Sequence, residues 1–417
     1  MSAPALDSPT VDALDSARDR GRLGVVSVLW PTAGQELLLR AAVIPGPAAL
    51  AAWDRWKADH DLVESELDHG SFRLLALVYK NLLARGADEP LMPRLKGIYR
   101  YWWCSNQRLF YRAAGVIHGL DEARIPSLAL KGAAASVAHY HDTGVRPMGD
   151  IDLLVPYDRA AAAVAQLGRI GWTPARPRVP DLIRYQHSVR MIHETGEALD
   201  LHWHVLAECV HRDADRGFWE RAVPVRILDS DTLALGPADA LLHTVVHGMR
   251  WNEEPTIRWV ADAMAILQDA RATIDWEALE REARAQRLVL RLRMGLDYLK
   301  RRMDAPIPEH LLERLQSAPP SGVERMEFRV LALGADGDGP ITPRHALLVT
   351  VQYLRFLSGR TLRQKLAETP AYLRYRLRGR QGWFFDAVRA VRRGFRRLLG
   401  RGPAPRAQAG GGTRASR

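Results

Sequence analysis

The sequence predicts an α+β fold, in which a small mixed β-sheet with helices is embedded in N-terminal and C-terminal helical regions. Short apolar runs with alternating polar residues gather between residues 123 and 228, as expected of strands. Before and after this segment, apolar residues recur at helical spacing. The chain has 417 residues, 47 % of them hydrophobic, which is enough to bury a substantial core.

These patterns divide the chain into five segments. Its two ends combine Ser, Pro, Gly, Ala and charged residues and are expected to be disordered. The predicted segments are a disordered N-terminus at 1–22, an N-terminal helical region at 23–122, a catalytic core at 123–228, a C-terminal helical region at 229–400 and a disordered tail at 401–417.

The N-terminal region shows four helical patterns, at 36–42, 47–60, 71–85 and 91–120. The last of them carries a group of aromatic residues, namely Tyr99, Tyr101, Trp102, Trp103, Phe110 and Tyr111. Aromatic residues on a helix usually pack against neighbouring elements. We therefore expect this group to enter the core rather than to stack on nucleic-acid bases.

Two carboxylates open the central strand of the predicted core. Residues Ile151 to Val155 form a short apolar run that predicts a buried strand. Side chains alternate along a strand, so Asp150 and Asp152 emerge on the same side. Two carboxylates on one buried face repel each other unless a cation or a proton compensates.

A third carboxylate lies on a second predicted strand. Residues 198–204 alternate, with Asp200, His202 and His204 on one face. Together with residues 188–192 and the turn at 194–197, this strand predicts a hairpin. If it pairs with the first strand, the three carboxylates converge. Such an oxygen-rich cluster suits Mg²⁺ or Mn²⁺.

Upstream, the sequence predicts the other half of a phosphate site. Residues 125–130 are typical of a strand, Lys131 and Gly132 of a turn, and residues 133–140 of a helix. A glycine at the start of a helix lets backbone amides approach an anion, and Lys131 adds a positive charge. Farther along, residues 172–184 are rich in Pro and Arg and predict a surface loop.

A strand, a glycine turn, a helix and a strand that opens with Asp-x-Asp resemble the DNA polymerase β-like nucleotidyltransferase superfamily. More closely, the chain is similar to a family of largely uncharacterised bacterial nucleotidyltransferases, on the motifs Leu130-Lys131-Gly132, Arg146-Pro147, Gly149-Asp150-Ile151-Asp152 and Asp200-Leu201-His202-Trp203. This resemblance runs from about Leu37 to Leu267. One departure is Ala133, because many members of the superfamily carry Gly-Ser or Gly-Gly at the helix start.

The resemblance implies a metal-dependent enzyme that moves a nucleoside monophosphate from a nucleoside triphosphate (NTP), such as ATP, to a hydroxyl or amine acceptor and releases pyrophosphate. Asp150 and Asp152 would hold both metal ions, Mg²⁺ or Mn²⁺, and Asp200 would hold the one that activates the acceptor. The implied substrate-binding residues are Lys131, Gly132, Arg146, Gly149 and His202.

Two of these residues have alternatives, and so does the function. Arg146 could neutralise charge on the leaving group or form a surface ion pair, and His202 could orient a ligand or act as a base. The alternative functions are a nucleotide-binding scaffold recruited through a basic C-terminal tail, and transfer of the γ-phosphoryl group at the same metal site. The acceptor, the preferred NTP and the oligomeric state are left open by the sequence.

Charge is distributed unevenly along the chain. Of the net charge of +11, residues 355–417 supply +15, from 17 Lys or Arg against two acidic residues, so residues 1–354 sum to −4. A core of that sign does not favour nucleic acid as a partner. The helical pattern at 383–399, apolar on one side and rich in arginine, could lie on an anionic membrane surface or dock on a partner.

Three further features bear on location and cofactors. No run of eighteen apolar residues occurs, which predicts a cytoplasmic protein, with possible peripheral contact through the basic helix. Cys104 and Cys209 are expected to be small buried hydrophobes. His243 and His247 lie one helical turn apart and could hold a metal, although a structural or substrate-facing role is favoured; Asp262 could orient a substrate or pair within the helices.

Overall fold

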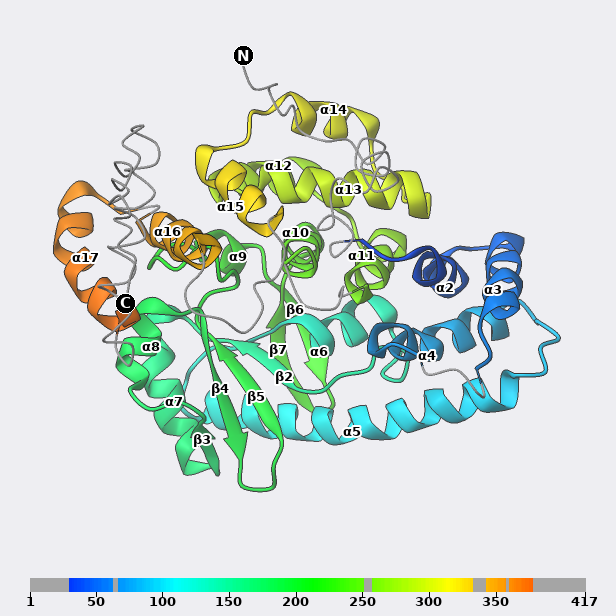
Figure 1. Cartoon of the computed structure of the whole chain (residues 1–417). Coiled ribbons are helices and arrows are strands. Elements are labelled where there is room, and N and C mark those ends of the chain that lie inside the picture. Colours follow the sequence, from blue (N-terminus) through cyan, green and yellow to red (C-terminus); the bar gives the residue numbers. More distant parts are fainter. Residues whose placement is uncertain (1–29, 63–66, 251–256, 333–342, 358–359, 378–417) are drawn as a thin grey trace, which may run out of the picture.

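The computed structural model describes residues 30–62, 67–250, 257–332, 343–357 and 360–377. Within these ranges, helices surround a seven-stranded mixed sheet, which confirms the predicted α+β class (Figure 1). The predicted disordered ends at 1–22 and 401–417 and the basic helix at 383–399 lie outside the described residues.

The sheet has the strand order β3-β4-β5-β2-β1-β7-β6. Its central strand β2 runs parallel to β5 and antiparallel to β1, and β1 runs parallel to β7. The two outer pairs, β3 with β4 and β6 with β7, are antiparallel. The strands are β1 Leu128–Ala129, β2 Ile151–Leu154, β3 Trp172–Pro174, β4 Ser188–His193, β5 Ala198–His202, β6 Val223–Ile227 and β7 Ser230–Ala234.

The register of β2 and β5 confirms the predicted alternation. Asp152 stands opposite Asp200, and Leu154 stands opposite His202. Directly opposed residues of neighbouring strands point to the same face of a sheet. The predicted hairpin is also present, since β4 and β5 pair across the turn at 194–197.

The sheet extends beyond the predicted core in two places. Strand β7 lies past the boundary at 228, yet it pairs with the central part of the sheet through β1. Its sequence is too polar to be recognised as a strand; Thr232 is buried and satisfied because its hydroxyl donates to the Ser127 carbonyl at 2.9 Å. At the other edge, β3 and helix α8 Val179–Tyr185 replace the predicted loop at 172–184. Pro174 is tolerated there because it ends an edge strand.

The four predicted N-terminal helices are all present. They are α2 Ala33–Val43, α3 Pro47–Asp59, α4 His69–Leu83 and α5 Met92–Glu122. Helix α2 begins with a capping box, in which the side chains of Thr32 and Gln35 satisfy each other's backbone amides. Helix α5, with 31 residues, passes along the sheet (Figure 1).

The aromatic residues of α5 do not form the buried group that the sequence predicts. Phe110 is buried, but Tyr101, Trp103 and Tyr111 are 61 %, 44 % and 70 % exposed. Successive residues are about 100° apart around a helix, so adjacent aromatic residues cannot all face the core. Cys104 is likewise exposed, contrary to the prediction, whereas Cys209 is buried as expected.

After the sheet, helices dominate as predicted. They are α9 Arg216–Glu220, α10 Pro237–Gly248, α11 Arg258–Gln268, α12 Trp276–Ala285, α13 Val289–Met303, α14 Glu309–Ser317, α15 Gly322–Ala332, α16 Pro343–Leu357 and α17 Leu362–Leu377. Among the described helices, none is both long and apolar enough to cross a membrane.

Two hydrophobic clusters lie on opposite faces of the sheet. One joins Leu153, Leu199 and Leu201 to the buried side of α5 and to α7 Ala160–Arg169. The other joins Leu154 to the N-terminal helices and to α10–α14. Because Asp152, Asp200 and His202 alternate with the first set, they point toward the second face.

Candidate functional site

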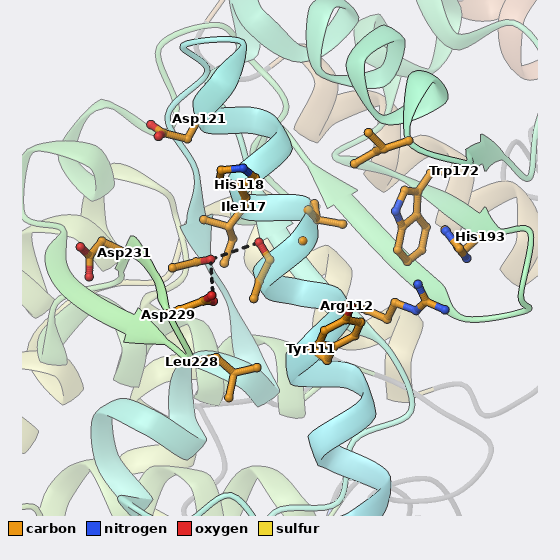
Figure 2. A pocket seen from close by; sticks show the side chains of 15 residues that line it. Tyr111, Arg112, Ile117, His118, Asp121, Trp172, His193, Leu228, Asp229 and Asp231 are labelled. Carbon is orange, nitrogen blue, oxygen red and sulfur yellow. Dashed lines mark hydrogen bonds between the residues drawn. The ribbon is translucent and has the colours of Figure 1, made fainter.

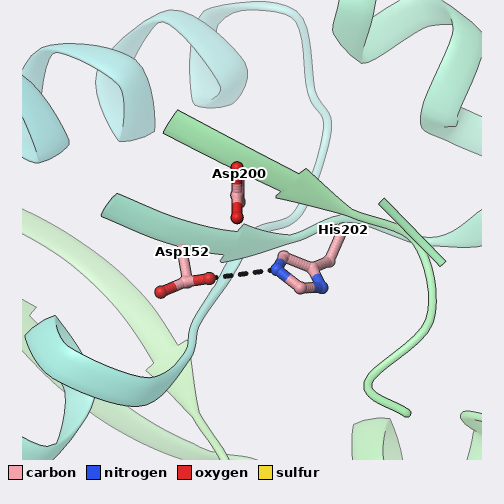
Figure 3. Close-up of side chains that lie close together, drawn as sticks. All are labelled: Asp152, Asp200 and His202. Atoms are coloured by element: carbon pink, nitrogen blue, oxygen red, sulfur yellow. Dashed lines mark hydrogen bonds and ion pairs between the residues drawn. The ribbon is translucent and has the colours of Figure 1, made fainter. Parts of the chain in front are cut away.

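The side chains of Asp152, Asp200 and His202 form a compact group on β2 and β5 (Figure 3). One ligand atom from each lies within 4.8 Å of the others. The group is built by the parallel register, which places Asp152 beside Asp200, and by the strand period, which places His202 one step farther on the same face.

Asp152 is buried and carries two direct partners. The Lys131 Nζ donates to its Oδ1 at 2.5 Å, and the His202 Nε2 lies 3.1 Å from the same oxygen. Burial alone would raise the pKa of Asp152, but the Lys131 ammonium and the His202 hydrogen bond hold it well below its usual range. Asp152 is therefore a carboxylate at neutral pH. Lys131 supplies positive charge to this carboxylate, a contact that the sequence does not indicate.

Asp150 lies one residue before β2 and stands outside the compact group. It is half-buried, and burial together with the charges of Asp152 and Asp200 raises its pKa above the ordinary value. The predicted repulsion between carboxylates thus appears in the raised pKa of Asp150, whereas Lys131 and His202 outweigh it at Asp152. A cation placed among the three carboxylates would relieve it.

The donor set fits a hard divalent ion. Two carboxylates offer oxygen ligands of the kind that Mg²⁺ and Mn²⁺ prefer, and an imidazole is acceptable to Mn²⁺. His202 is buried, and its Nδ1 has no hydrogen-bond partner among the residues that the structure describes. Its Nε2 already contacts Asp152, so His202 can orient that carboxylate or add a ligand.

Lys131 and Gly132, predicted to form a turn, are instead the first two residues of a short helix, α6 Lys131–Ala135, which continues as a π-helical turn to Tyr140. Lys131 has a φ of +44°, a rare conformation for a residue other than glycine. Gly132 is buried, and a Cβ there would lie 2.5 Å from the Arg146 Nη1 and 2.7 Å from the Met148 Sδ. Close packing against Arg146 and Met148 therefore accounts for this glycine without reference to phosphate.

Arg146 is buried rather than part of a surface ion pair. Its Nε and Nη2 donate to the two oxygens of Asp262 at 2.9 and 2.8 Å. The Tyr140 hydroxyl donates to the same carboxylate at 3.0 Å. Asp262, on α11, thus forms a structural ion pair, but its partner lies in the loop before β2 and not in another helix as predicted.

A buried asparagine of α5 holds the loop that leads to Asp150. The Asn106 side chain donates to the backbone carbonyls of Thr143 and Arg146 at 2.6 and 2.9 Å and accepts from the Met148 amide at 3.1 Å. The turn is fixed to the rigid helix by these three bonds. After it, Gly149 is exposed, and a Cβ at Gly149 would meet nothing within 4 Å.

Helix α10 presents the buried His243 and the half-buried His247 to this region. Burial, the Lys131 charge and Arg250 lower the pKa of His243 to about 3, and burial and Arg250 lower the pKa of His247 well below its usual value. Within the described ranges the His243 Nε2 has no hydrogen-bond partner, and the two rings lie 5.7 Å apart. Both side chains are neutral, and neither belongs to the compact group around Asp152.

Several neighbours of the site are not evident from the sequence. Arg190 stands opposite Asp200 across the β4–β5 pair, and His187 lies edge-on to His202 with ring centroids 5.3 Å apart. Side chains alternate along β4, which places Arg190 on the polar face. The sequence pattern alone could therefore have indicated this position. Arg73 on α4 and Arg258 on α11 both donate to the Pro147 carbonyl, and no sequence spacing indicates that they meet.

A separate hollow of about 880 Å³ lies beside α5, and none of the predicted site residues lines it. Figure 2 shows its walls, with Tyr111 and His118 from α5, Trp172 and His193 from the β3–β4 edge, and Leu228 from the β6–β7 hairpin. Size alone does not make it the reaction site. Within the described residues, the group able to hold a metal ion lies at Asp152, Asp200 and His202 instead.

Comparison with known proteins agrees with this geometry. Residues 71–304, more than half of the chain, match the family described as uncharacterised nucleotidyltransferase. The chain belongs to this family. It is therefore a nucleotidyltransferase, and the matched segment runs from α4 through α13, beginning later than Leu37 and ending beyond Leu267.

Comparisons with curated proteins and with solved structures add little to this assignment. No curated protein matches the sequence. The solution structure of the antibiotic-resistance factor ANT(2'')-Ia has 14 % identity and a TM-score of 0.32, over 44 % of this chain and 92 % of that one. An antigenic nucleotidyltransferase-like protein from Paracoccidioides brasiliensis has 11 % identity and a TM-score of 0.31, over 49 % and 96 %. Scores this low carry no argument about this chain.

Proposed function

We propose that this nucleotidyltransferase is metal-dependent and moves a nucleoside monophosphate from an NTP to a hydroxyl or amine group of a small molecule or a protein, with release of pyrophosphate. The observation that carries the proposal is the in-register pair Asp152 and Asp200 on adjacent parallel strands, completed by His202. Membership of the family supports the reaction class, and the donor set supports Mg²⁺ or Mn²⁺.

In this proposal Asp150, Asp152 and Asp200 hold the metal ions, and His202 orients Asp152. Bound metal would offset negative charge on the phosphates and lower the pKa of the attacking group. Lys131 keeps Asp152 ionised, ready for that role. Arg190, opposite Asp200, is placed to contact a substrate on the same face.

The transfer itself needs an in-line displacement. The acceptor oxygen or nitrogen forms a bond to the α-phosphorus, and the bond from that phosphorus to the bridging oxygen of the β-phosphate breaks. Pyrophosphate leaves with the bond electrons. The proton of the acceptor goes to Asp200, which is half-buried at the edge of the group and can act as a base.

The experiment compares NTPs labelled at the α or the γ phosphorus, incubated with Mg²⁺ and a panel of hydroxyl and amine compounds. Transfer of the α label with release of pyrophosphate is expected. Transfer of the γ label would replace the proposal with phosphoryl transfer. Binding of NTP without transfer of either label to any acceptor would favour a nucleotide-binding scaffold.

Asp200→Ala provides the matched variant for this experiment. Because the NTP with its own Mg²⁺ can still contact Asp150 and Asp152, we expect turnover to be lost while NTP affinity stays within a few-fold of wild type. Calorimetry with NTP and Mg²⁺ measures that affinity. Joint loss of binding and turnover would instead place Asp200 in the nucleotide site or in the fold.

We also propose where in the cell the enzyme is found. We place the enzyme in the cytoplasm, with peripheral membrane contact through the basic segment at 383–399, whose arginines favour an anionic surface. The mildly acidic balance of residues 1–354 makes nucleic acid an unsuitable acceptor.

A further inference from the structure

Three arginines from distant parts of the sequence meet beside the candidate site. Arg73 comes from α4, Arg146 from the loop before β2, and Arg258 from α11. The Nη2 of Arg73 and the Nη1 of Arg258 donate to one acceptor, the Pro147 carbonyl, at 3.0 and 3.2 Å. Arg146, the preceding residue, is buried against Gly132, and its charge acts on both Arg73 and Arg258.

The cluster holds more positive charge than its neighbours compensate. Both oxygens of Asp262 are taken by Arg146, and one of them also by Tyr140. Arg73 and Arg258 form no ion pair with a carboxylate among the described residues, and the Arg73 Nε is buried without a partner. Arg73 and Arg258 are half-buried, so their guanidinium groups lose part of their hydration without an ion pair among the described residues, which is unfavourable.

The pKa values of Arg258 and Arg73 agree with this excess of positive charge. Burial, then repulsion from Arg146 and Arg73, lowers the pKa of Arg258 to about 9. Burial and Arg146 also lower the pKa of Arg73, and only Asp150 and Asp262 act in the opposite direction. Each guanidinium is thus held close to others of the same sign, an arrangement that a bound anion would stabilise.

The position of the arginine cluster indicates which anion it would bind. Pro147 lies three residues before Asp150, and a Cβ on Gly132 would touch the Arg146 guanidinium. Gly149, between Pro147 and Asp152, is exposed and faces open space. Asp150 acts electrostatically on Arg73, and Asp152 acts on Arg146, so an anion on the cluster would lie near the candidate metal carboxylates, where an NTP would place its polyphosphate.

We propose that Arg73, Arg146 and Arg258 form a polyphosphate subsite, which binds the β- and γ-phosphates of the NTP and the pyrophosphate that leaves. Arg73 and Arg258 supply the charges that bind the anion, and Arg146, fixed by Asp262, positions the loop between them. This inference deepens the proposed function and rests on it for the identity of the nucleotide. It also gives the helical regions a part in the site, because α4 and α11 each contribute one arginine.

The test uses inorganic tripolyphosphate in the presence of EDTA, so that the metal site does not contribute. Calorimetry on the full chain should show binding to wild type, and the dissociation constant should rise about tenfold or more in Arg258→Gln and in Arg73→Gln, since each loses a charge-assisted hydrogen bond. Arg258→Lys should recover part of the affinity because it keeps the charge.

Arg85→Gln is the matched control. Arg85 lies two residues after the end of α4. Like Arg73, it donates to a backbone carbonyl, in this case that of Ile44, which is away from the cluster. It should bind tripolyphosphate as wild type does. If the cluster only fastens the loop to the helices, Arg258→Gln and Arg73→Gln will lose thermal stability without any specific change in tripolyphosphate affinity, and the proposal is overturned.

The outcomes separate this inference from the proposed function. Arginine-dependent binding of tripolyphosphate without transfer of the α label to any acceptor would retain the subsite and reject the reaction. Transfer of the α label, with tripolyphosphate bound equally by wild type and the arginine variants, would retain the reaction and reject the subsite. Absence of tripolyphosphate binding to folded wild-type protein would also reject the subsite.

Discussion

The two faces of the central sheet are built from the same strands, yet they differ in the polarity of the side chains at its centre. On one face, Leu153, Leu199 and Leu201 are fully buried against α5 and α7. On the other, Asp152 and His202 are equally inaccessible but polar. Adjacent residues of one strand therefore point to opposite faces, one lined by apolar and one by polar side chains.

The difference shows how the fold can tolerate buried charge. The apolar face contributes hydrophobic burial, about 25 cal/mol for each Å² removed from water. The polar face needs a partner for each charge. Lys131 pairs with Asp152, whereas Asp150 forms no salt bridge within the part of the chain that the structure describes, and its pKa is raised. We infer that the apolar face stabilises the sheet, while the polar face is completed by metal and nucleotide.

Asp152→Asn should produce the largest effect and tests the polar face. Losing a metal-binding carboxylate removes several kcal/mol of transition-state stabilisation, so turnover should fall by about a thousandfold or more. The measurement is the initial rate of pyrophosphate release at saturating NTP and Mg²⁺. Circular dichroism checks that the variant is folded.

The control for that variant is Asp231→Asn. Asp231 lies on β7, with a side chain that is 83 % exposed, and is expected to leave the rate unchanged. Full activity in Asp152→Asn would show that the polar face is not the reaction site.

Leu201→Ala tests the apolar face with a smaller expected effect. Leu201 lies between Asp200 and His202 on β5 and is fully buried. Truncation removes buried methyl groups and leaves a cavity, so the free energy of unfolding should fall by about 3 kcal/mol, measured by urea denaturation. The rate per folded molecule should stay close to wild type. A large loss of rate with unchanged stability would contradict the division of labour between the faces.

The strand period made much of the site predictable from the sequence. Alternation alone places Asp200 and His202 on one face and Leu201 on the other, and the apolar run after Asp150 indicates the buried strand. The convergence of Asp200 and His202 with Asp152 followed from the assumption that β5 pairs with β2. These are local patterns, in which two or three residue types at fixed spacing determine the direction of a side chain.

The arginine cluster and the outer strands could not be predicted in this way. Arg73 and Arg258 lie 185 positions apart and meet only because α4 and α11 pack near the same loop. Strand β7 is recognisable only beside β1, its partner. The exposed residues Tyr101 and Trp103 are a different case, because the angular spacing of a helix already excludes their burial together with Trp102.

The last and smallest predicted effect concerns α10, which covers the polar face. His243 is buried and neutral, with a pKa lowered to about 3 from its ordinary value of 6.5. Below pH 6.5 the unfolded chain takes up a proton at this position and the folded chain does not, so stability is lost as the pH falls from 6.5 toward 3. This residue adds a slope of at most about 1.4 kcal/mol per pH unit.

His243→Gln should reduce that slope between pH 6.5 and 4.5, as measured by urea denaturation at several pH values. His118→Gln is the matched control, because His118 is exposed on α5, on the other side of the sheet, and should leave the slope unchanged. The hydrogen-bonding potential of Gln replaces that of the imidazole without its titration. Equal slopes in wild type and His243→Gln would mean that His243 does not remain neutral in the fold, and that α10 offers the polar face a titrating charge instead.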